Sequence, residues 1–436
     1  MQLAPKHILR ILILVGLAIL AYLPALGLPF IWDDYGQIPL ASQWAAQGWA
    51  PMWHDADLQT RATYMFLSAW LDRAFGFTPL PFYAVSMLLH AACVLLLYAI
   101  CVWSEFSESL AFWAAGFFAI YEGHNEAIMW LPGSTELLLF LFGMLGWVCW
   151  VKWVQRGGWH WYLAAMAGFL LAVASKESAF IFPFLMLLPV FFQQRHWRRG
   201  LVGILPFLAV AAAYLAWTWA GRITQPGYQD IRFSLASPWP LTILRSFWRL
   251  LFVWGIVALA VLGWIGKPDD RRKVWIASLW MILGIVPYAF LVYMPFIPSR
   301  HTYLASAGLA LLVGAAAVRL VENGRRTLLL ILCAATLAAN VEILWVKKTS
   351  QLRDRAEASE LLKQVARQAR GPIYVDCTPF YGFLAEAILS SEGKQAIFRS
   401  GATQAGNCFV VEYTDAAGNQ VRINRRLEAK KHGVFY

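Results

Sequence analysis

Apolar residues occur in a series of long runs that are separated by short polar segments. Most runs have close to the roughly 20 residues that an α-helix needs to cross the hydrocarbon core of a bilayer. Eleven runs predict membrane-spanning helices, near residues 8–28, 82–103, 110–128, 135–154, 159–174, 179–193, 200–220, 241–265, 274–292, 302–320 and 327–346. The pattern therefore predicts an all-α polytopic membrane protein with about 11 transmembrane helices.

The pattern changes after Trp345. Residues 351–370 form a charged amphipathic helical pattern, and residues 373–375, 409–413 and 421–423 alternate as strands do. Eleven spans place this segment outside if the amino terminus is cytoplasmic. We therefore predict two domains, a membrane domain over 1–346 and a small extracytoplasmic α/β tail over 347–436.

Composition and charge support the same class. The chain is 60% hydrophobic and 14% charged, whereas soluble domains have about 25% charged residues. A net charge of +11 would also suit nucleic-acid binding, but most Lys and Arg lie in short loops between the runs, as the positive-inside rule requires. We expect a multi-pass protein of a bacterial inner or plasma membrane, with the lipid bilayer and no nucleic acid as its partner.

Cysteines bear on the compartment of the tail. Four of the six cysteines fall in predicted spans, and Cys377 and Cys408 are the only pair outside them. A disulfide between these two would form only in an oxidising compartment.

Four polar clusters lie at the edges of apolar runs. Asp33-Asp34 follows the first span, His124 to Glu136 lies between spans three and four, Lys176-Glu177 between five and six, and Arg300-His301 between nine and ten. All four follow odd-numbered spans and therefore share one membrane face, the periplasmic or external one. Acids and cations that converge on one face predict a site for a charged substrate.

Each cluster also has a purely structural explanation. The aspartate pair could be a loop pair or a helix cap, Lys176-Glu177 an intramembrane salt bridge, and Arg300-His301 side chains that reach the headgroups. His124 could be an interfacial histidine, and the glutamates of residues 122–136 could cap helix ends. Four such coincidences on one face are less plausible than one site.

These segments resemble a known superfamily. The likeness rests on Trp32-Asp33-Asp34, His124-Asn125-Glu126-Ala127 with Glu136-Leu137-Leu138, Ser175-Lys176-Glu177 and Arg300-His301-Thr302-Tyr303-Leu304. In this order they resemble the GT-C membrane glycosyltransferases, and most closely the protein O-mannosyltransferase-like branch, over residues 1–345. The resemblance implies transfer of a sugar from a polyprenyl-phosphate donor to an acceptor hydroxyl outside the cytoplasm, generally with inversion.

The likeness is incomplete. Tyr121-Glu122 stands where that branch tends to have His-Pro, and Ser134-Thr135 replaces an arginine expected before Glu136. No 34-residue helical repeat follows the membrane part, so the class of acceptor does not carry over.

The chemistry of glycosyl transfer gives each polar residue a role. A base must take the proton of the attacking hydroxyl, and we assign this to Asp33, with Asp34 orienting it or holding the acceptor. The leaving phosphate needs fixed cations, for which Arg300 and Lys176 are candidates and His301 is in reserve. The remaining donor- or substrate-binding candidates are Glu126, Glu136 and Glu177, which could grip sugar hydroxyls or orient the cations, together with His124 and Tyr303 from the resemblance.

Other functions stay open at this point. A transporter or flippase of lipid-linked sugars would place ionisable residues near mid-span and on both faces, with inverted repeats, and a lipid-linked-glycan ligase or polymerase is a nearer rival. Some GT-C enzymes use a divalent metal, which the acid-rich face could hold, but no ligand spacing requires one.

Overall fold

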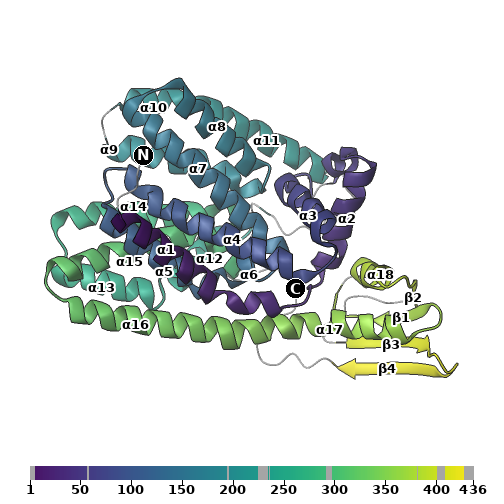
Figure 1. The fold of residues 1–436 in the computed structure, drawn as a ribbon. Helices are drawn as coiled ribbons and strands as arrows, with labels where there is room; N and C mark the ends of the chain where they lie inside the picture. Colours follow the sequence, from purple (N-terminus) through teal and green to yellow (C-terminus); the bar gives the residue numbers. More distant parts are fainter. Residues whose placement is uncertain are drawn as a thin grey trace. The chain divides into compact units, whose positions relative to one another are not determined.

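The structure is a computed structural model, and it describes residues 5–55, 58–193, 196–223, 234, 236–290, 297–380, 382–399 and 408–426. These residues are mostly helical (Figure 1). They form two compact units, which are described separately. The first comprises Met1–Leu23, Trp49–Tyr64 and Tyr83–Trp345, and the second Pro24–Gly48, Met65–Phe82 and Val346–Tyr436.

The first unit is helical throughout its described residues. Its longer elements are the α-helices, and short 3-10 helices join several of them. The elements that lie wholly or mainly in this unit are α1 (Pro5–Ala21), η2 (Ala50–His54), α4 (Pro79–Tyr98), η3 (Ala99–Val102), α5 (Glu108–Ile120), η4 (Glu122–His124), α6 (Asn125–Ile128), η5 (Leu131–Gly133), α7 (Ser134–Arg156), α8 (Trp159–Val173), η6 (Glu177–Ile181), α9 (Phe182–Gln193), α10 (Trp197–Gly203), α11 (Leu205–Ile223), α12 (Trp239–Leu251), α13 (Trp254–Ile265), α14 (Pro268–Ile285), η8 (Val286–Tyr288), η9 (Ser299–Thr302), α15 (Tyr303–Glu322) and α16 (Arg326–Glu342).

Every predicted span contains at least one of these helices, which confirms the helical membrane fold. Six helical stretches among the described residues are long and apolar enough to cross a membrane, or seven if one bent pair counts as a span. α5, α8 and α9 are apolar but shorter. The count of eleven spans therefore stays a prediction. The six are Pro5–Gly27, Pro79–Val102, Leu131–Arg156, Trp197–Thr218, Ser299–Glu322 and Arg326–Gln368.

The predicted span over residues 241–265 is not one straight helix. It consists of α12 and α13, which meet at an angle of 74°. The break lies at Phe252 and Val253, where Val253 has a φ of 64°. A β-branched residue at positive φ is a backbone outlier, so the surrounding packing must hold the bend in place.

Helix α15 is the central helix of the first unit and packs against α5, α13 and α14. Glycines allow this close approach. A Cβ atom at Gly308 would lie 2.5 Å from the carbonyl oxygen of Ala277 on α14, and one at Gly314 would lie 2.6 Å from that of Leu110 on α5. Small residues let membrane helices approach backbone to backbone. α15 is therefore held firmly, and its first turn carries part of the candidate site.

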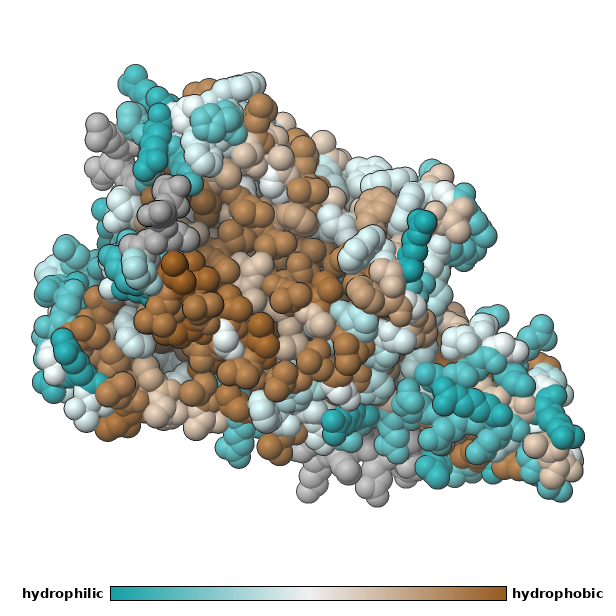
Figure 2. All heavy atoms as spheres, in the orientation of Figure 1, coloured by the Kyte–Doolittle hydropathy of each residue, from teal (hydrophilic) through white to brown (hydrophobic). Residues whose placement is uncertain are grey.

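The outside of the first unit is rich in apolar side chains. Figure 2 shows hydrophobic residues gathered over its helices. Large exposed apolar residues include Leu12 and Leu20 on α1, Leu88 on α4, and Leu330 and Ile331 on α16. A soluble protein rarely exposes so much contiguous apolar surface, and lipid contact accounts for it.

The second unit contains a small sheet. Its strands are β1 (Ile373–Cys377), β2 (Ala396–Phe398), β3 (Cys408–Thr414) and β4 (Gln420–Arg426), in the order β2-β1-β3-β4. β1 runs parallel to β2 and antiparallel to β3, and β3 and β4 form a hairpin around residues 415–418. The predicted strands are confirmed.

Helices and segments from the start of the chain complete the second unit, and α18 packs against β2 of the sheet. The helices are α2 (Asp33–Gln47), most of α3 (Ala62–Phe75), α17 (Thr349–Gln368) and α18 (Gly382–Ser391), and a π-helical stretch, Ile343–Lys348, precedes α17. α18 packs against α2 and α17. The unit thus contains the predicted tail together with residues 24–48 and 65–82.

A disulfide joins two strands of the second unit. It links Cys377 at the end of β1 to Cys408 at the start of β3, with Cα atoms 5.8 Å apart. The remaining cysteines, which lie in the helices of the first unit or next to them, are free. The one pair that the sequence singled out is therefore the pair that is bonded.

Candidate active site

Glu136 is the centre of a buried charged cluster in the first unit. It lies in the first turn of α7, and only 1% of its surface is exposed. Lys176 Nζ lies 2.6 Å from Glu136 Oε1, and His301 Nδ1 lies 2.7 Å from the same oxygen. Lys176 Nζ also lies 3.3 Å from His301 Nδ1. Three residues predicted from separate loops thus meet at one carboxylate.

Two further residues complete this cluster, and sequence reasoning missed both. The hydroxyl of Tyr288 lies 3.0 Å from each carboxylate oxygen of Glu136 and 2.7 Å from Ser178 Oγ. The Tyr288 ring also stacks on His301, with centroids 4.3 Å apart. Tyr288 lies inside a predicted apolar run, where a tyrosine reads as an interfacial aromatic residue, and Ser178 carried no signal.

The cluster is electrically compensated. Burial lowers the pKa of Lys176, and the neighbouring Glu136 carboxylate opposes that shift without cancelling it. Removal of either partner would leave a buried charge uncompensated, which is costly. Lys176 therefore already has a close counter-ion. Among the glutamates that the sequence suggested could orient the cations, Glu136 is the one that contacts Lys176.

Arg300 is the more accessible cation of the candidate site. Its side chain is 22% exposed, and its Nη1 lies 3.7 Å from Glu126 Oε2. The guanidinium carbon lies 4.9 Å from the centroid of the Trp130 ring. A charge-assisted hydrogen bond is usually about 2.7–2.9 Å long, so Arg300 is only loosely paired and can reach a new anion.

Glu126 holds the turn from which Arg300 projects. Its Oε2 accepts a hydrogen bond from Ser299 Oγ at 2.8 Å and one from the Arg300 backbone N–H at 3.4 Å. Both donors belong to η9, whereas Glu126 belongs to α6. Glu126 therefore positions the arginine through the backbone as well as through charge.

Glu177 faces a different neighbour from Lys176. Its Oε2 accepts a hydrogen bond from Thr60 Oγ1 at 3.2 Å, and the adjacent Ser175 Oγ lies 2.7 Å from Thr63 Oγ1. The predicted alternative of a Lys176–Glu177 salt bridge is thus replaced by a Lys176–Glu136 pair. Glu177 anchors the segment around Thr60.

His124 and Tyr303 lie inside the helix bundle. Both are 0% exposed, and their ring centroids are 4.4 Å apart. His124 Nε2 lies 2.6 Å from Ser306 Oγ, and the Tyr303 hydroxyl lies 2.7 Å from His90 Nδ1. In this structure they contact other side chains of α15 and its neighbours, beneath the turn that carries Arg300.

Asp33 and Asp34 belong to the second unit, where they begin α2. Asp34 is 0% exposed, and its Oδ2 accepts a hydrogen bond from the Ile31 backbone N–H at 2.7 Å. Its Oδ1 is buried and has no hydrogen-bond partner among the described residues. Burial raises the pKa of Asp34 well above its usual range, and the nearby Asp33 carboxylate adds to the rise.

The two carboxyls are therefore unequal. Asp33 is partly exposed at the first position of the helix, where the backbone N–H groups favour a negative charge. Trp32, just before it, has a φ of 41°. Non-glycine residues at such angles store strain and are concentrated at functional sites. Burial therefore disfavours the ionised form of Asp34, whereas Asp33 is the more accessible carboxyl of the pair.

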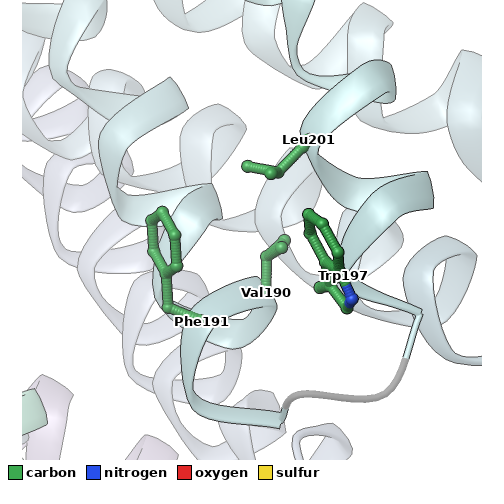
Figure 3. Close-up of a pocket in the computed structure, with 4 residues that line it drawn as sticks. All are labelled: Val190, Phe191, Trp197 and Leu201. Atoms are coloured by element: carbon green, nitrogen blue, oxygen red, sulfur yellow. The ribbon is translucent and has the colours of Figure 1, made fainter.

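Metal binding and cavities add little to this site. Within the described ranges, no group of three or more His, Cys, Asp or Glu side chains could hold a metal ion. A cavity of about 390 Å³ opens between α9 and α10 (Figure 3). It is lined by Val190, Phe191, Trp197 and Leu201, so its walls offer no group for acid–base chemistry.

Comparison with known proteins places the fold. No protein-family model and no curated protein sequence matches the chain. Among solved structures, it is similar to ArnT from Cupriavidus metallidurans bound to undecaprenyl phosphate, with a TM-score of 0.53 and 11% identity, covering 92% of this chain and 87% of ArnT. It is also similar to the archaeal oligosaccharyltransferase AglB from Archaeoglobus fulgidus, in complex with an inhibitory peptide and a dolichol-phosphate. That match has a TM-score of 0.53 and 12% identity, and covers 84% of this chain and 58% of AglB.

Both neighbours are GT-C superfamily glycosyltransferases. This chain has the GT-C fold. The fold that the ordered motifs implied is therefore supported by a comparison of structures that does not depend on those motifs. Within a GT-C fold, a buried Glu136–Lys176–His301 cluster beside a loosely paired Arg300 is the arrangement that any functional proposal must explain.

Proposed function

We propose that this protein transfers a sugar, most simply a hexose, from a polyprenyl-phosphate donor to an acceptor hydroxyl on the extracytoplasmic side of the membrane, with inversion at the anomeric carbon. The observation that carries the proposal is the loosely paired Arg300 guanidinium over Trp130, next to a compensated buried charge cluster. Two proteins of the same fold were solved with undecaprenyl phosphate and dolichol-phosphate, which are lipids of the class that would leave in this reaction.

The reaction proposed for this chain is a single displacement. The acceptor oxygen forms a bond to the anomeric carbon while the bond from that carbon to the phosphate oxygen breaks. Asp33 takes the proton of the acceptor hydroxyl, and the electron pair of the broken bond leaves with the lipid phosphate. Attack from the face opposite the leaving group inverts the configuration.

The positive groups of the first unit have distinct tasks in this proposal. Arg300 gives up its long contact to Glu126 and binds the phosphate as negative charge develops there, where fixed donors are most effective. Lys176, whose charge Glu136 already balances, adds a positive potential that needs no reorganisation. Tyr288 and His301 keep the Glu136 carboxylate oriented toward Lys176. The motifs favour a branch like the protein O-mannosyltransferases.

The aspartate pair provides the first test. Asp33→Asn removes the proton acceptor, so transfer should fall by at least about 10²-fold. Asp34→Asn replaces a carboxyl whose ionised form burial already disfavours, so it should reduce transfer less. Purified variants in nanodiscs would be assayed with a panel of undecaprenyl-phosphate hexoses for release of undecaprenyl phosphate. Wild-type turnover by Asp33→Asn would exclude Asp33 as the base.

The phosphate-binding role of Arg300 has a matched control in the same chain. Arg325 also lies over a tryptophan ring, with its guanidinium carbon 3.9 Å from the Trp264 centroid, but it follows the opposite end of α15. Arg300→Lys should weaken binding of undecaprenyl phosphate about tenfold, because an ammonium group does not reproduce the guanidinium fork. Arg325→Lys should leave binding unchanged in a calorimetric titration. Equal affinities in all three proteins would place the phosphate elsewhere.

A further inference from the structure

Helix α12 has its two faces reversed relative to a helix of a soluble protein. The face that packs into the first unit carries Thr242, Ser246 and Leu250, spaced four residues apart and all buried. The outward face is apolar, with Leu244 53% and Trp248 58% exposed. Leu241 and Phe252 extend this outward surface. A helix in water would expose its hydroxyls and bury its leucines.

Two arginines border the apolar face. Arg245 and Arg249 lie one helical turn apart, at the boundary between the exposed apolar side and the buried side of α12. Arg245 is exposed and has no ion pair with an acidic side chain in the part of the chain that the structure describes. Helices with leucine and tryptophan on one side and arginine on the other lie in the membrane interface. Tryptophan side chains are enriched at the same membrane–water interface.

The length of α12 agrees with this placement. Thirteen residues span about 20 Å at 1.5 Å per residue, which is too short to cross about 30 Å of hydrocarbon. The 74° bend at its end prevents α13 from extending it in the same direction. α12 therefore lies along a membrane surface rather than across the membrane.

The inward face of α12 holds the segment that leads to Arg300. Ser246 Oγ accepts a hydrogen bond from the Ile297 backbone N–H at 3.2 Å, and Arg249 Nη1 donates one to the Ile297 carbonyl oxygen, also at 3.2 Å. Ile297 is 2% exposed. After Pro298, the turn η9 begins with Ser299 and Arg300. Both backbone groups of Ile297 are thus fixed by one helix.

We infer that α12 is an interfacial helix whose apolar face is seated in the phospholipid headgroup region of the bilayer, and that its grip on Ile297 fixes Arg300 at the level of the lipid phosphates. The lipid contact follows from the faces and length of α12 alone. The positioning of Arg300 for a lipid-phosphate donor rests on the proposed function, in which that donor arrives from the bilayer at this level.

Photocrosslinking tests the lipid contact without any enzymatic turnover. Benzoylphenylalanine would replace Leu244 or, separately, Trp248 in the full chain, reconstituted in vesicles of phosphatidylglycerol and phosphatidylethanolamine. After irradiation, mass spectrometry should find phospholipid adducts at both positions. The control position is Ala417, which is exposed in the β3–β4 turn. Absence of adducts at both α12 positions, or equal yields at Ala417, would overturn the inference.

Variants on the inward face test the grip on Ile297. Ser246→Ala and Arg249→Gln should each speed amide hydrogen exchange at Ile297 by about three- to tenfold, the usual range for one lost hydrogen bond. Arg249→Lys keeps a donor and should restore most of the protection. Thr242→Ala is the matched control, because that hydroxyl bonds only within α12, to Pro238 at 3.3 Å.

Kinetics separate positioning from general stability. Ser246→Ala and Arg249→Gln should raise the KM for the lipid donor about three- to tenfold while kcat changes less than about twofold. Unchanged exchange at Ile297 and unchanged donor KM in both variants would refute the positioning role. If wild-type protein transfers no sugar yet exchange changes as expected, the proposed function fails while the α12–Ile297 contact stands.

Discussion

Helix α15 has a buried charged cluster at each end, and the two differ in kind. Near its first turn, the Glu136 carboxylate is shared by Lys176, His301 and Tyr288. Near its last turn, Arg319 meets Asp270 in a bidentate pair, with Nε to Oδ2 at 2.5 Å and Nη2 to Oδ1 at 2.9 Å. Both carboxylates are less than 5% exposed.

The cluster at the last turn is closed. The planar guanidinium matches both carboxylate oxygens of Asp270, and Lys273 Nζ and the Lys267 backbone N–H bind the same side chain. The Arg319 guanidinium keeps its protons at ordinary pH. The cluster fastens α14 to α15 and leaves no group to act on a substrate.

The cluster at the first turn is built from groups that can gain or lose a proton, and a loosely held cation lies in the same turn as His301. Arg300 is 3.7 Å from its carboxylate partner and partly exposed. Buried charge alone therefore does not identify an active site. Variety among the titratable groups, together with a cation that can change partners, distinguishes the two ends.

The largest expected effect comes from Lys176. Lys176→Met leaves Glu136 buried without its counter-ion, which should cost about 3–5 kcal/mol of folding stability and reduce sugar transfer by at least about 10²-fold. The double variant Glu136→Gln with Lys176→Met removes both charges, so it should regain most of the stability but not the activity. Thermal unfolding followed by tryptophan fluorescence and a transfer assay in nanodiscs measure the two quantities.

This pair of variants separates function from folding at the first turn. Recovery of both stability and turnover in the double variant would show that the cluster is structural, like the one at the last turn. Failure of the double variant to regain stability would mean that His301 or Tyr288 depends on the charges.

A smaller effect, on stability alone, is expected at the last turn. Asp270→Asn removes the charge that the Arg319 guanidinium pairs with, so the unfolding midpoint should fall by several degrees. Turnover at a temperature where the variant is folded should stay within about twofold of wild type. A loss of transfer comparable to that of Lys176→Met would erase the distinction between the two ends of α15.

The smallest effect is a dependence on pH. Burial alone would raise the pKa of Asp270, but hydrogen bonds from Arg319, the Lys267 backbone and Lys273 lower it from 3.8 to about 2. A carboxyl with a lowered pKa stabilises the folded state above its ordinary pKa, and that contribution is lost as the pH falls toward the folded value. The midpoint difference between wild type and Asp270→Asn should therefore be constant above about pH 5 and shrink below the ordinary pKa. A difference that does not shrink between pH 5 and pH 2.5 would contradict the assignment.

The fold was largely predictable because long apolar runs and alternating strands are local signals. These signals do not predict where the axis of a helix changes direction. Residues 241–265 read as one mostly apolar run, and neither Phe252 nor Val253 at the break is a proline or glycine that would announce it. Hydropathy measures composition over a window, whereas the bend depends on what α12 and α13 pack against.

The sequence singled out Glu136, Lys176 and His301, which meet in one cluster, but it did not predict how they pair. Lys176 has an extended backbone, with φ −166° and ψ 146°, so its side chain and that of Glu177 point in opposite directions. Lys176 therefore reaches Glu136, 40 residues earlier, and Glu177 reaches Thr60. Tyr288 was missed because nothing local distinguishes a tyrosine that bonds a buried carboxylate from one at the membrane surface.

The surroundings of Asp33 and Asp34 are made from the two extremes of the chain. In the second unit the Tyr35 hydroxyl donates to Glu360 Oε1 at 3.2 Å across 325 residues, and the Trp32 ring lies 6.3 Å from that of Phe380. At about 5–20 residues per second, the ribosome needs roughly 15–65 s to add that length.

A nascent chain therefore carries Asp33, the proposed general base, for most of its synthesis before the partners of the neighbouring Trp32 and Tyr35 exist. We expect ribosome-arrested chains that end before Val346 to lack sugar transfer, and chains that include the whole second unit to gain it in one step. A gradual rise of activity with chain length would contradict this order of assembly. The timing of synthesis thus delays the proposed chemistry until residues 346–436 have emerged.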